Sequence, residues 1–287
     1  MSISTADIKS LREATGAGPL DCKKALQETN GDVDAAIEFL RKKGLASASK
    51  KTSREANDGL VTAFISPDGK VGAMVEVNCE TDFVARTDDF KNFVASVLKL
   101  VVSNPTFTSP EALLAAPSAS DAARTNQELM TELIAKLGEN MILRRVARFN
   151  LDDSGLIDSY IHMGGRVGVL VEATGMALGD SKALAVLHDV ALQIAAAAPQ
   201  FVTIDEVPAA MAEAEKELYR GQMAEEKKPA DVKERIIEGK LKKWYTQVVL
   251  NEQEFVKDNS LSMTKLLKSH SDNFQIRRFA RFELGTN

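Results

Sequence analysis

The sequence has few of the residues that build metal centres and disulfide frameworks. Its 287 residues include only two cysteines, three histidines and one tryptophan. Two cysteines imply no disulfide framework, and free thiols at Cys22 and Cys79 fit a reducing compartment. The histidines, His162, His188 and His270, show no metal-ligand spacing. We therefore expect free cysteines, no metal site and no cofactor.

Long hydrophobic runs are also missing. No apolar stretch approaches the ~20 residues that a helix needs to span a bilayer. The first residues lead directly into a helical pattern, without the basic and apolar segments of a secretory signal. The net charge of −5, carried by mixed signs, argues against a general nucleic-acid binder. We expect a cytoplasmic protein that binds neither membrane nor nucleic acid directly.

The motifs of common enzyme sites are not found either. The phosphate-loop pattern G-x-x-x-x-G-K-[ST] does not occur. The glycine-rich residues 164–168 (GGRVG) fall at a predicted hairpin turn and lack the strand–loop–helix order of a dinucleotide site. The sequence therefore predicts a protein that is not an enzyme. The remaining enzymatic hypothesis is a small-molecule site at these glycines that depends on His162.

What the chain does have is length and apolar content for two or three domains, since 44% of its residues are hydrophobic. Residues 1–46 predict three short helices separated by breaker clusters, with the third helix stopping near Gly44. Residues 47–58 lack apolar periodicity and predict a linker.

From residue 59 onward the chain repeats itself. Two segments recur at a constant offset of 96 residues (155 − 59 and 165 − 69): 59–65 (GLVTAFI) as 155–161 (GLIDSYI), and 69–76 (GKVGAMVE) as 165–172 (GRVGVLVE). A third recurs at an offset of 133 (277 − 144): 142–149 (ILRRVARF) as 275–282 (QIRRFARF). Each unit predicts a β-hairpin, helical segments and a third strand, so we expect an α+β core present twice, at 59–151 and 152–287.

The second unit is longer than the first by the difference between these offsets, 133 − 96, or 37 residues. The extra segment is residues 208–245, where apolar residues thin out among many charges. Residues 227–231 (KKPAD) interrupt this segment, and Asp231 with Glu234 resembles a capping box. We predict an inserted antiparallel helical hairpin with arms of ~19 residues, or roughly 28 Å.

One corner of the first unit joins a predicted buried strand to a predicted helix. Apolar residues 71–75 precede it, and the helical face that begins at Phe90 follows it. Asn78 or Thr81 is expected to cap the helix. Spacing alone favours a structural role, with Phe83 as the first core residue of the helix and Asp82 complementing its dipole.

The closing strands carry arginine clusters. Strand alternation predicts Arg144 and Arg148 on one face and Arg145 on the other. The same layout recurs at Arg277, Arg278 and Arg281. Arginines next to an aromatic residue could bind RNA. Their presence in both halves of an acidic chain favours pairing with Glu76 and Glu172 across the sheet instead.

Residues 78–85 (NCETDFVA) resemble the signature of the bacterial elongation factor Ts family. Residues 18–26 (GPLDCKKAL) and 30–32 (NGD) resemble that family's ubiquitin-associated-type N-terminal domain. The likeness covers nearly the whole chain and keeps the segments in order. It implies an α+β fold with a three-helix partner-docking domain at 1–46, a duplicated core and an inserted helical hairpin.

The resemblance also implies a function: guanine-nucleotide exchange on the GTPase elongation factor Tu, without an active site. Such a factor binds the GDP form, displaces Mg²⁺ and lets GDP leave, so that GTP can rebind. In this sequence the segment linked to Mg²⁺ displacement matches Thr81, Asp82, Phe83 and Val84. The aromatic ring would wedge between helices of the partner. Further partner contacts carry over to His162, Arg12 and Leu20.

Many family members continue into a C-terminal helix that touches the partner's nucleotide-binding domain. This sequence stops at Gly285-Thr286-Asn287, so we expect exchange with weaker binding. The alternative hypothesis is a translation-associated adaptor that docks proteins through residues 1–46 and never opens a nucleotide site. A homodimeric or higher-order assembly also remains open.

Overall fold

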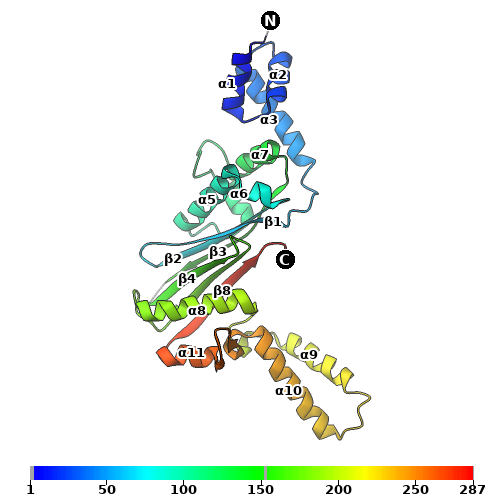
Figure 1. The fold of residues 1–287 in the computed structure, drawn as a ribbon, viewed down its shortest axis with the longest axis vertical. Coiled ribbons are helices and arrows are strands. Elements are labelled where there is room, and N and C mark those ends of the chain that lie inside the picture. Colours follow the sequence, from blue (N-terminus) through cyan, green and yellow to red (C-terminus); the bar gives the residue numbers. More distant parts are fainter. Residues whose placement is uncertain (1–2, 152–153, 287) are drawn as a thin grey trace.

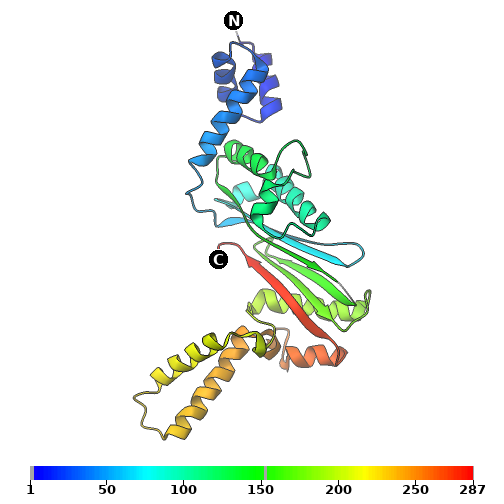
Figure 2. The same ribbon diagram turned by 180° about the vertical axis from the view of Figure 1, so that it is seen from behind.

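The computed structural model describes residues 3–151 and 154–286. Its elements are helices and antiparallel sheets, which confirms the α+β class. The molecule is elongated, with the N-terminal helices at one end, two sheets in the middle and a helical hairpin at the other end (Figures 1 and 2). Among the described residues, no helix is both long and apolar enough to cross a membrane.

Three helices form the N-terminal end: α1 (Thr5–Thr15), α2 (Pro19–Glu28) and α3 (Val33–Ser49). Ser4 closes a capping box at the start of α1, and Gly16 ends this helix in the left-handed conformation. A small core holds the helices together, made of Leu11, Cys22, Ala25, Leu26 and Ala36.

The prediction that the third helix stops near Gly44 is wrong, because α3 continues to Ser49. A Cβ at Gly44 would lie 3.3 Å from the Cβ of Ala135 in α7 (Asn126–Leu137). The glycine therefore lets two helices approach closely, and this packing offsets its low helix propensity. As a result, the first three residues of the predicted 47–58 linker belong to the helix.

The first sheet has the order β1-β2-β3, all antiparallel, from β1 (Asp58–Ile65), β2 (Val71–Cys79) and β3 (Met141–Asn150). Between β2 and β3 the chain forms α4 (Asp82–Ala85), α5 (Asp88–Ser103), α6 (Pro110–Ala115) and α7. Helix α5 packs its apolar face against the sheet, where Phe90, Val94 and Val97 are buried.

The second sheet repeats this plan. Its order is β4-β5-β8, from β4 (Gly155–His162), β5 (Val167–Thr174) and β8 (Gln275–Glu283). Helix α8 (Ser181–Ala197) covers it as α5 covers the first sheet (Figure 1). The repeated segments of the sequence therefore form equivalent strands. Residues 152 and 153, at the predicted start of the second unit, lie outside the described residues.

The two sheets pack face to face through glycines at equivalent positions of the repeat. A Cβ at Gly72 would lie 2.6 Å from Cγ2 of Ile157, and a Cβ at Gly168 would lie 2.4 Å from Cγ1 of Val61. Only glycine permits this spacing. The layer between the sheets contains the buried side chains of Val61, Met74, Phe149, Ile157, Leu170, Phe282 and Leu284.

The predicted arginine–glutamate pairs are confirmed. Glu76 is fully buried and accepts a hydrogen bond of 2.6 Å from Nε of Arg145. Glu172 is equally buried and accepts bonds from Arg277 (3.0 Å) and Arg278 (2.8 Å). Buried carboxylates need such partners, because an unpaired buried charge is strongly destabilising.

The predicted alternation of these arginines is wrong. Arg144 and Arg145 reach the same buried network, since Arg144 donates to Asn78 (2.5 Å) and Asn78 donates to Glu76 (3.1 Å). Arg148 instead donates to the carbonyl of Val101 near the end of α5. A β-bulge between Glu76 and Val77 shifts the register by one residue and brings adjacent side chains together.

Residues 209–248 form two helices, α9 (Ala209–Gln222) and α10 (Ala230–Val248), which project as a hairpin (Figures 1 and 2). Its base is buried around Leu241, Trp244 and Val248. The predicted capping box is wrong, because α10 starts after Pro229 and Asp231 lies inside its first turn. The remaining elements are η1 (Ile204–Glu206), η2 (Leu250–Glu252), β6 (Glu254–Phe255), β7 (Asp258–Ser262) and α11 (Met263–His270).

Candidate functional site

The corner after β2 contains a helix of a single turn. Thr81 caps α4 by accepting the backbone N–H of Val84 at 3.4 Å, and Thr87 caps α5 in the same way. The prediction of one continuous helix here is therefore wrong. Asn78 is not a cap; it is buried, and its amide bonds Glu76 and Arg144.

The break between the two helices turns Phe83 out of the core. Its side chain is 80% exposed, although its neighbour Val84 is buried. The expectation that Phe83 is the first core residue is wrong, because its seven-residue spacing from Phe90 assumed one uninterrupted helix. Asp82 is partly exposed and pairs with Arg86 at 2.7 Å. An exposed aromatic ring on a fixed backbone is typical of a protein-binding anchor.

Glu139, just after α7, holds the corner in place. Its two carboxylate oxygens accept the backbone N–H of Thr81 at 3.0 Å and the hydroxyl of Thr81 at 2.7 Å. Sequence reasoning missed this residue. The only local signal is the left-handed Gly138 that ends α7. Nothing in the sequence links Glu139 to Thr81, which lies 58 positions earlier.

Cys79 lies beneath the corner and is chemically inert. Its Sγ is 3.1 Å from the carbonyl oxygen of Thr81. Burial and, to a lesser extent, the nearby carboxylate of Glu139 together raise the pKa of the Cys79 thiol to about 12. The thiol is neutral at physiological pH, so it is no nucleophile. Both cysteines are free, as predicted.

His162 ends β4 and is exposed at the β4–β5 turn, where the hydroxyl of Tyr160 lies 2.9 Å from its Nδ1. This turn contacts β1. Val61 donates its N–H to the carbonyl of Gly165 at 2.8 Å, and Arg166 pairs with Asp58 at 2.9 Å. Asp58 is the register partner of Cys79. The fold therefore brings the His162 turn and the corner after β2 to the same end of the sheets.

Arg12 and Leu20 lie elsewhere, among the N-terminal helices (Figure 1). Both are exposed, Leu20 to 82%. They are connected to the corner through α7. At one end of this helix Glu128 pairs with Arg41 of α3 at 2.5 Å, and after its other end comes Glu139.

Known proteins with similar sequences show which family this chain belongs to. A family model described as "Elongation factor TS" matches residues 80–286, a range that includes the corner with Phe83. A protein named elongation factor Ts from Trichlorobacter lovleyi is 46% identical, over 99% of this chain and 93% of that protein. Those from Aquifex aeolicus and Clostridium perfringens are 42% and 47% identical, over 99% of this chain and 99% and 93% of theirs.

The chain belongs to the elongation factor Ts family. Membership confirms the resemblance seen in residues 78–85 and identifies a factor of translation elongation.

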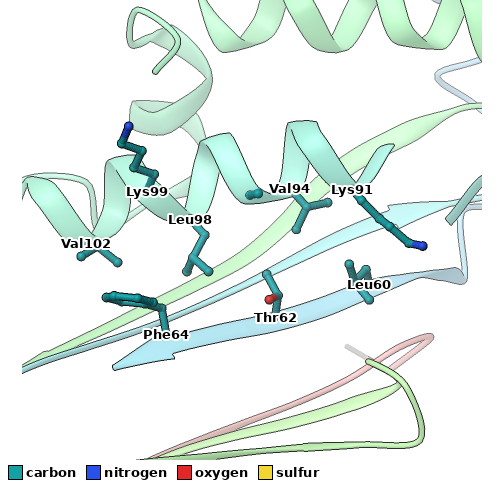
Figure 3. A pocket seen from close by; sticks show the side chains of 9 residues that line it. Leu60, Thr62, Phe64, Lys91, Val94, Leu98, Lys99 and Val102 are labelled. Carbon is teal, nitrogen blue, oxygen red and sulfur yellow. The ribbon is translucent and has the colours of Figure 1, made fainter. Parts of the chain in front are cut away.

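A pocket of about 460 Å³ lies between β1 and α5 (Figure 3). Figure 3 shows Leu60, Thr62 and Phe64 facing α5. Lys91 extends from the helix toward Leu60, whereas the side chain of Lys99 points away from β1. The residues that line it are apolar apart from Thr62, Lys91 and Lys99, and they include no carboxylate, cysteine or histidine.

The glycine-rich turn has a structural role. Gly164 and Gly165 have φ values of 66° and 100°, a conformation that favours glycine. A Cβ at Gly165 would also lie 2.3 Å from Cδ1 of Leu60. Within the described parts of the chain, no cluster of three or more His, Cys, Asp and Glu side chains could hold a metal ion.

Proposed function

We propose that this protein is the guanine-nucleotide exchange factor of elongation factor Tu. Membership of the elongation factor Ts family supports this role. The observation that carries it is Phe83, an exposed ring on a one-turn helix whose base is buried. The protein itself performs no covalent step and acts in the cytoplasm.

In the proposed mechanism, Phe83 inserts between helices of the partner's nucleotide-binding domain. Asp82 leaves its exposed pair with Arg86 and forms a hydrogen bond to the partner. Val84, buried under the corner, anchors the turn. An aromatic anchor of this kind typically accounts for ~2 kcal/mol or more of binding energy.

The inserted ring acts on Mg²⁺ indirectly, by moving the partner groups that hold the ion. Mg²⁺ bridges the protein and the phosphates, so its displacement removes the largest local charge that retains GDP. By linkage, a factor that weakens GDP binding is itself bound less tightly by the GDP form. The nucleotide-free partner is thus its preferred state, and GTP then refills the site.

The other exposed side chains would supply affinity at a distance from the nucleotide. His162 lies at the same end of the sheets as the corner, whereas Arg12 and Leu20 lie on the N-terminal helices. These separate surfaces suit a partner with more than one domain.

A second candidate function is an adaptor that only docks proteins. Leu20 favours it, because a leucine that is 82% exposed on the N-terminal helices offers a binding anchor without Phe83.

Stopped-flow release of a fluorescent GDP analogue from elongation factor Tu separates the two. We expect the wild type to accelerate release many-fold and Phe83→Ala to lose about 30-fold or more of this effect, the equivalent of ~2 kcal/mol. The control is Phe64→Ala, which truncates another exposed aromatic residue, on β1. If the wild type and Phe83→Ala both bind but neither accelerates release, the adaptor function is correct.

A further inference from the structure

The corner that presents Phe83 has little structure of its own. Helix α4 has four residues, Asp82–Ala85. An isolated turn of this length is not stable, because a first helical turn fixes several residues for few hydrogen bonds. The direction in which Phe83 points is therefore set by the contacts of its neighbours.

The strongest of these contacts is the bidentate one from Glu139 to Thr81. The carboxylate accepts both the N–H and the hydroxyl proton of Thr81, at 3.0 and 2.7 Å. With its proton directed at Glu139, the hydroxyl oxygen presents a lone pair to the N–H of Val84 at 3.4 Å. Glu139 thus fixes the side-chain orientation that caps α4. Phe83 lies between the two residues held in this way.

The same two segments exchange a second contact in the opposite direction. Glu80 accepts the backbone N–H of Asn140 at 2.7 Å, while Glu139 accepts that of Thr81. Asn140 is 2% exposed, and its side-chain amide donates to the carbonyl of Arg54 at 2.8 Å. Hydrogen bonds to charged groups are among the stronger ones in proteins. The start of β3 and the corner therefore form one unit.

Glu139 reaches this position because α7 ends two residues earlier, at Leu137. Gly138 has a φ of 84°, the left-handed conformation that turns the chain out of a helix, and a Cβ there would meet nothing within 4 Å. Glycine is thus favoured here by the left-handed backbone conformation and not by a lack of room for a side chain. The helix that contacts the N-terminal helices through Glu128 therefore also places the carboxylate that orients the corner.

We infer that Glu139 is a positioning residue for nucleotide exchange, acting through Thr81 to hold Phe83 in the orientation that enters the partner. The inference rests on the proposed exchange function. Glu139 is only partly exposed, and both of its carboxylate oxygens accept hydrogen bonds from Thr81. Its loss should therefore affect the opening of the nucleotide site more than the formation of the complex.

The test is Glu139→Gln in the full chain. Glutamine keeps the size of the side chain, but its amide nitrogen cannot accept a hydrogen bond, so one of the two contacts with Thr81 is lost. We expect the GDP-release rate at saturating factor to fall about tenfold, or ~1.4 kcal/mol. The concentration of factor that half-saturates release should change less than about threefold, which is no more than the loss of a weak surface contact would cause. The control is Glu132→Gln, on the same helix, where the carboxylate pairs with Arg124.

A second measurement uses the free protein and does not depend on elongation factor Tu. In Glu139→Gln, amide hydrogen exchange at Thr81 and Val84 should be about tenfold faster, while that of the central residues of β2 is unchanged. Thr81→Val should slow maximal release similarly, because it lacks the hydroxyl. Adding Glu139→Gln to Thr81→Val should cost less than about twofold more, because the remaining amide oxygen still accepts the N–H of Thr81.

These outcomes are distinguishable. If the wild type does not accelerate GDP release, the proposed function fails, and amide exchange still decides whether Glu139 orders the corner. If exchange activity depends on Phe83 but Glu139→Gln keeps the wild-type maximal rate, the inference is overturned. It is also overturned if only the half-saturating concentration changes. Should Glu139→Gln fail to fold by circular dichroism, Thr81→Val carries the same test without altering a charge.

Discussion

The guanidinium of Arg145 in the first sheet lies 4.8 Å from the ring centroid of Phe282 in the second. The equivalent residues of the repeat form the same contact in the other direction: the guanidinium of Arg278 in the second sheet lies 4.4 Å from the ring centroid of Phe149 in the first. Each of these arginines also binds the buried glutamate of its own sheet. The duplicated halves are therefore joined by two equivalent contacts, each of which combines a buried ion pair with a cation–π interaction.

Arg145→Ala should destabilise the protein strongly, because it leaves the buried carboxylate of Glu76 without its ion-pair partner. Breaking such a pair costs about 3–5 kcal/mol, to which the lost contact with Phe282 adds. The free energy of unfolding from urea titration checks this. Arg145→Met combined with Glu76→Gln should cost much less than Arg145→Ala. Equal losses in the two proteins would contradict the role of the buried charge.

Alanine should have opposite effects at two glycines. At Gly239, inside α10, a Cβ meets nothing within 4 Å, so Gly239→Ala should stabilise the hairpin by about 1 kcal/mol. At Gly72 a Cβ would lie 2.6 Å from Ile157 of the other sheet, so Gly72→Ala should destabilise by about 1–3 kcal/mol. Thermal unfolding measures both. A neutral Gly72→Ala would show that the sheets separate easily.

The sheets could be predicted from the sequence because the strand segments of the first unit recur in the second at fixed offsets. The helix whose apolar face begins at Phe90 also follows from apolar spacing, and the structure places α5 there. Two features that could not be predicted from sequence patterns, the outward turn of Phe83 and the pairing of adjacent arginines, each depend on a single residue. Thr87 starts a new helix and turns Phe83 outward, and one extra residue at a bulge places Arg144 beside Arg145.

The candidate site was located by a family signature, whereas its support could not be predicted. Thr81 and Glu139 are 58 positions apart, and their contact exists only because α7 ends at a left-handed glycine. Local patterns carry no information about such a pairing. Gly44 is similar, because only the approach of α3 to α7 explains a glycine inside that helix.

Cys79 should make the protein less stable at alkaline pH. The folded state raises the pKa of its thiol to about 12, well above the value of about 8.5 in an unfolded chain. A raised folded pKa means that its contribution to stability is complete below pH 8.5 and is lost as the pH rises toward 12. Urea titrations from pH 8 to 10.5 should show a steeper fall for the wild type than for Cys79→Ala. Parallel curves would exclude the thiol as a cause.

The exposed leucine of the N-terminal helices should contribute affinity and not exchange chemistry. Leu20→Ala should raise the concentration of factor that half-saturates GDP release by about fivefold, or ~1 kcal/mol, because an exposed apolar anchor is lost. The release rate at saturation should be unchanged, since Leu20 lies on α2, at the other end of the molecule from the hairpin and apart from the sheet that contains β2 (Figure 1). We expect it to hold the complex equally before and after GDP leaves. Val33→Ala, a shallower truncation on α3, is the matched control. A fall in the saturated rate with unchanged half-saturation would instead show that the N-terminal helices take part in opening the nucleotide site.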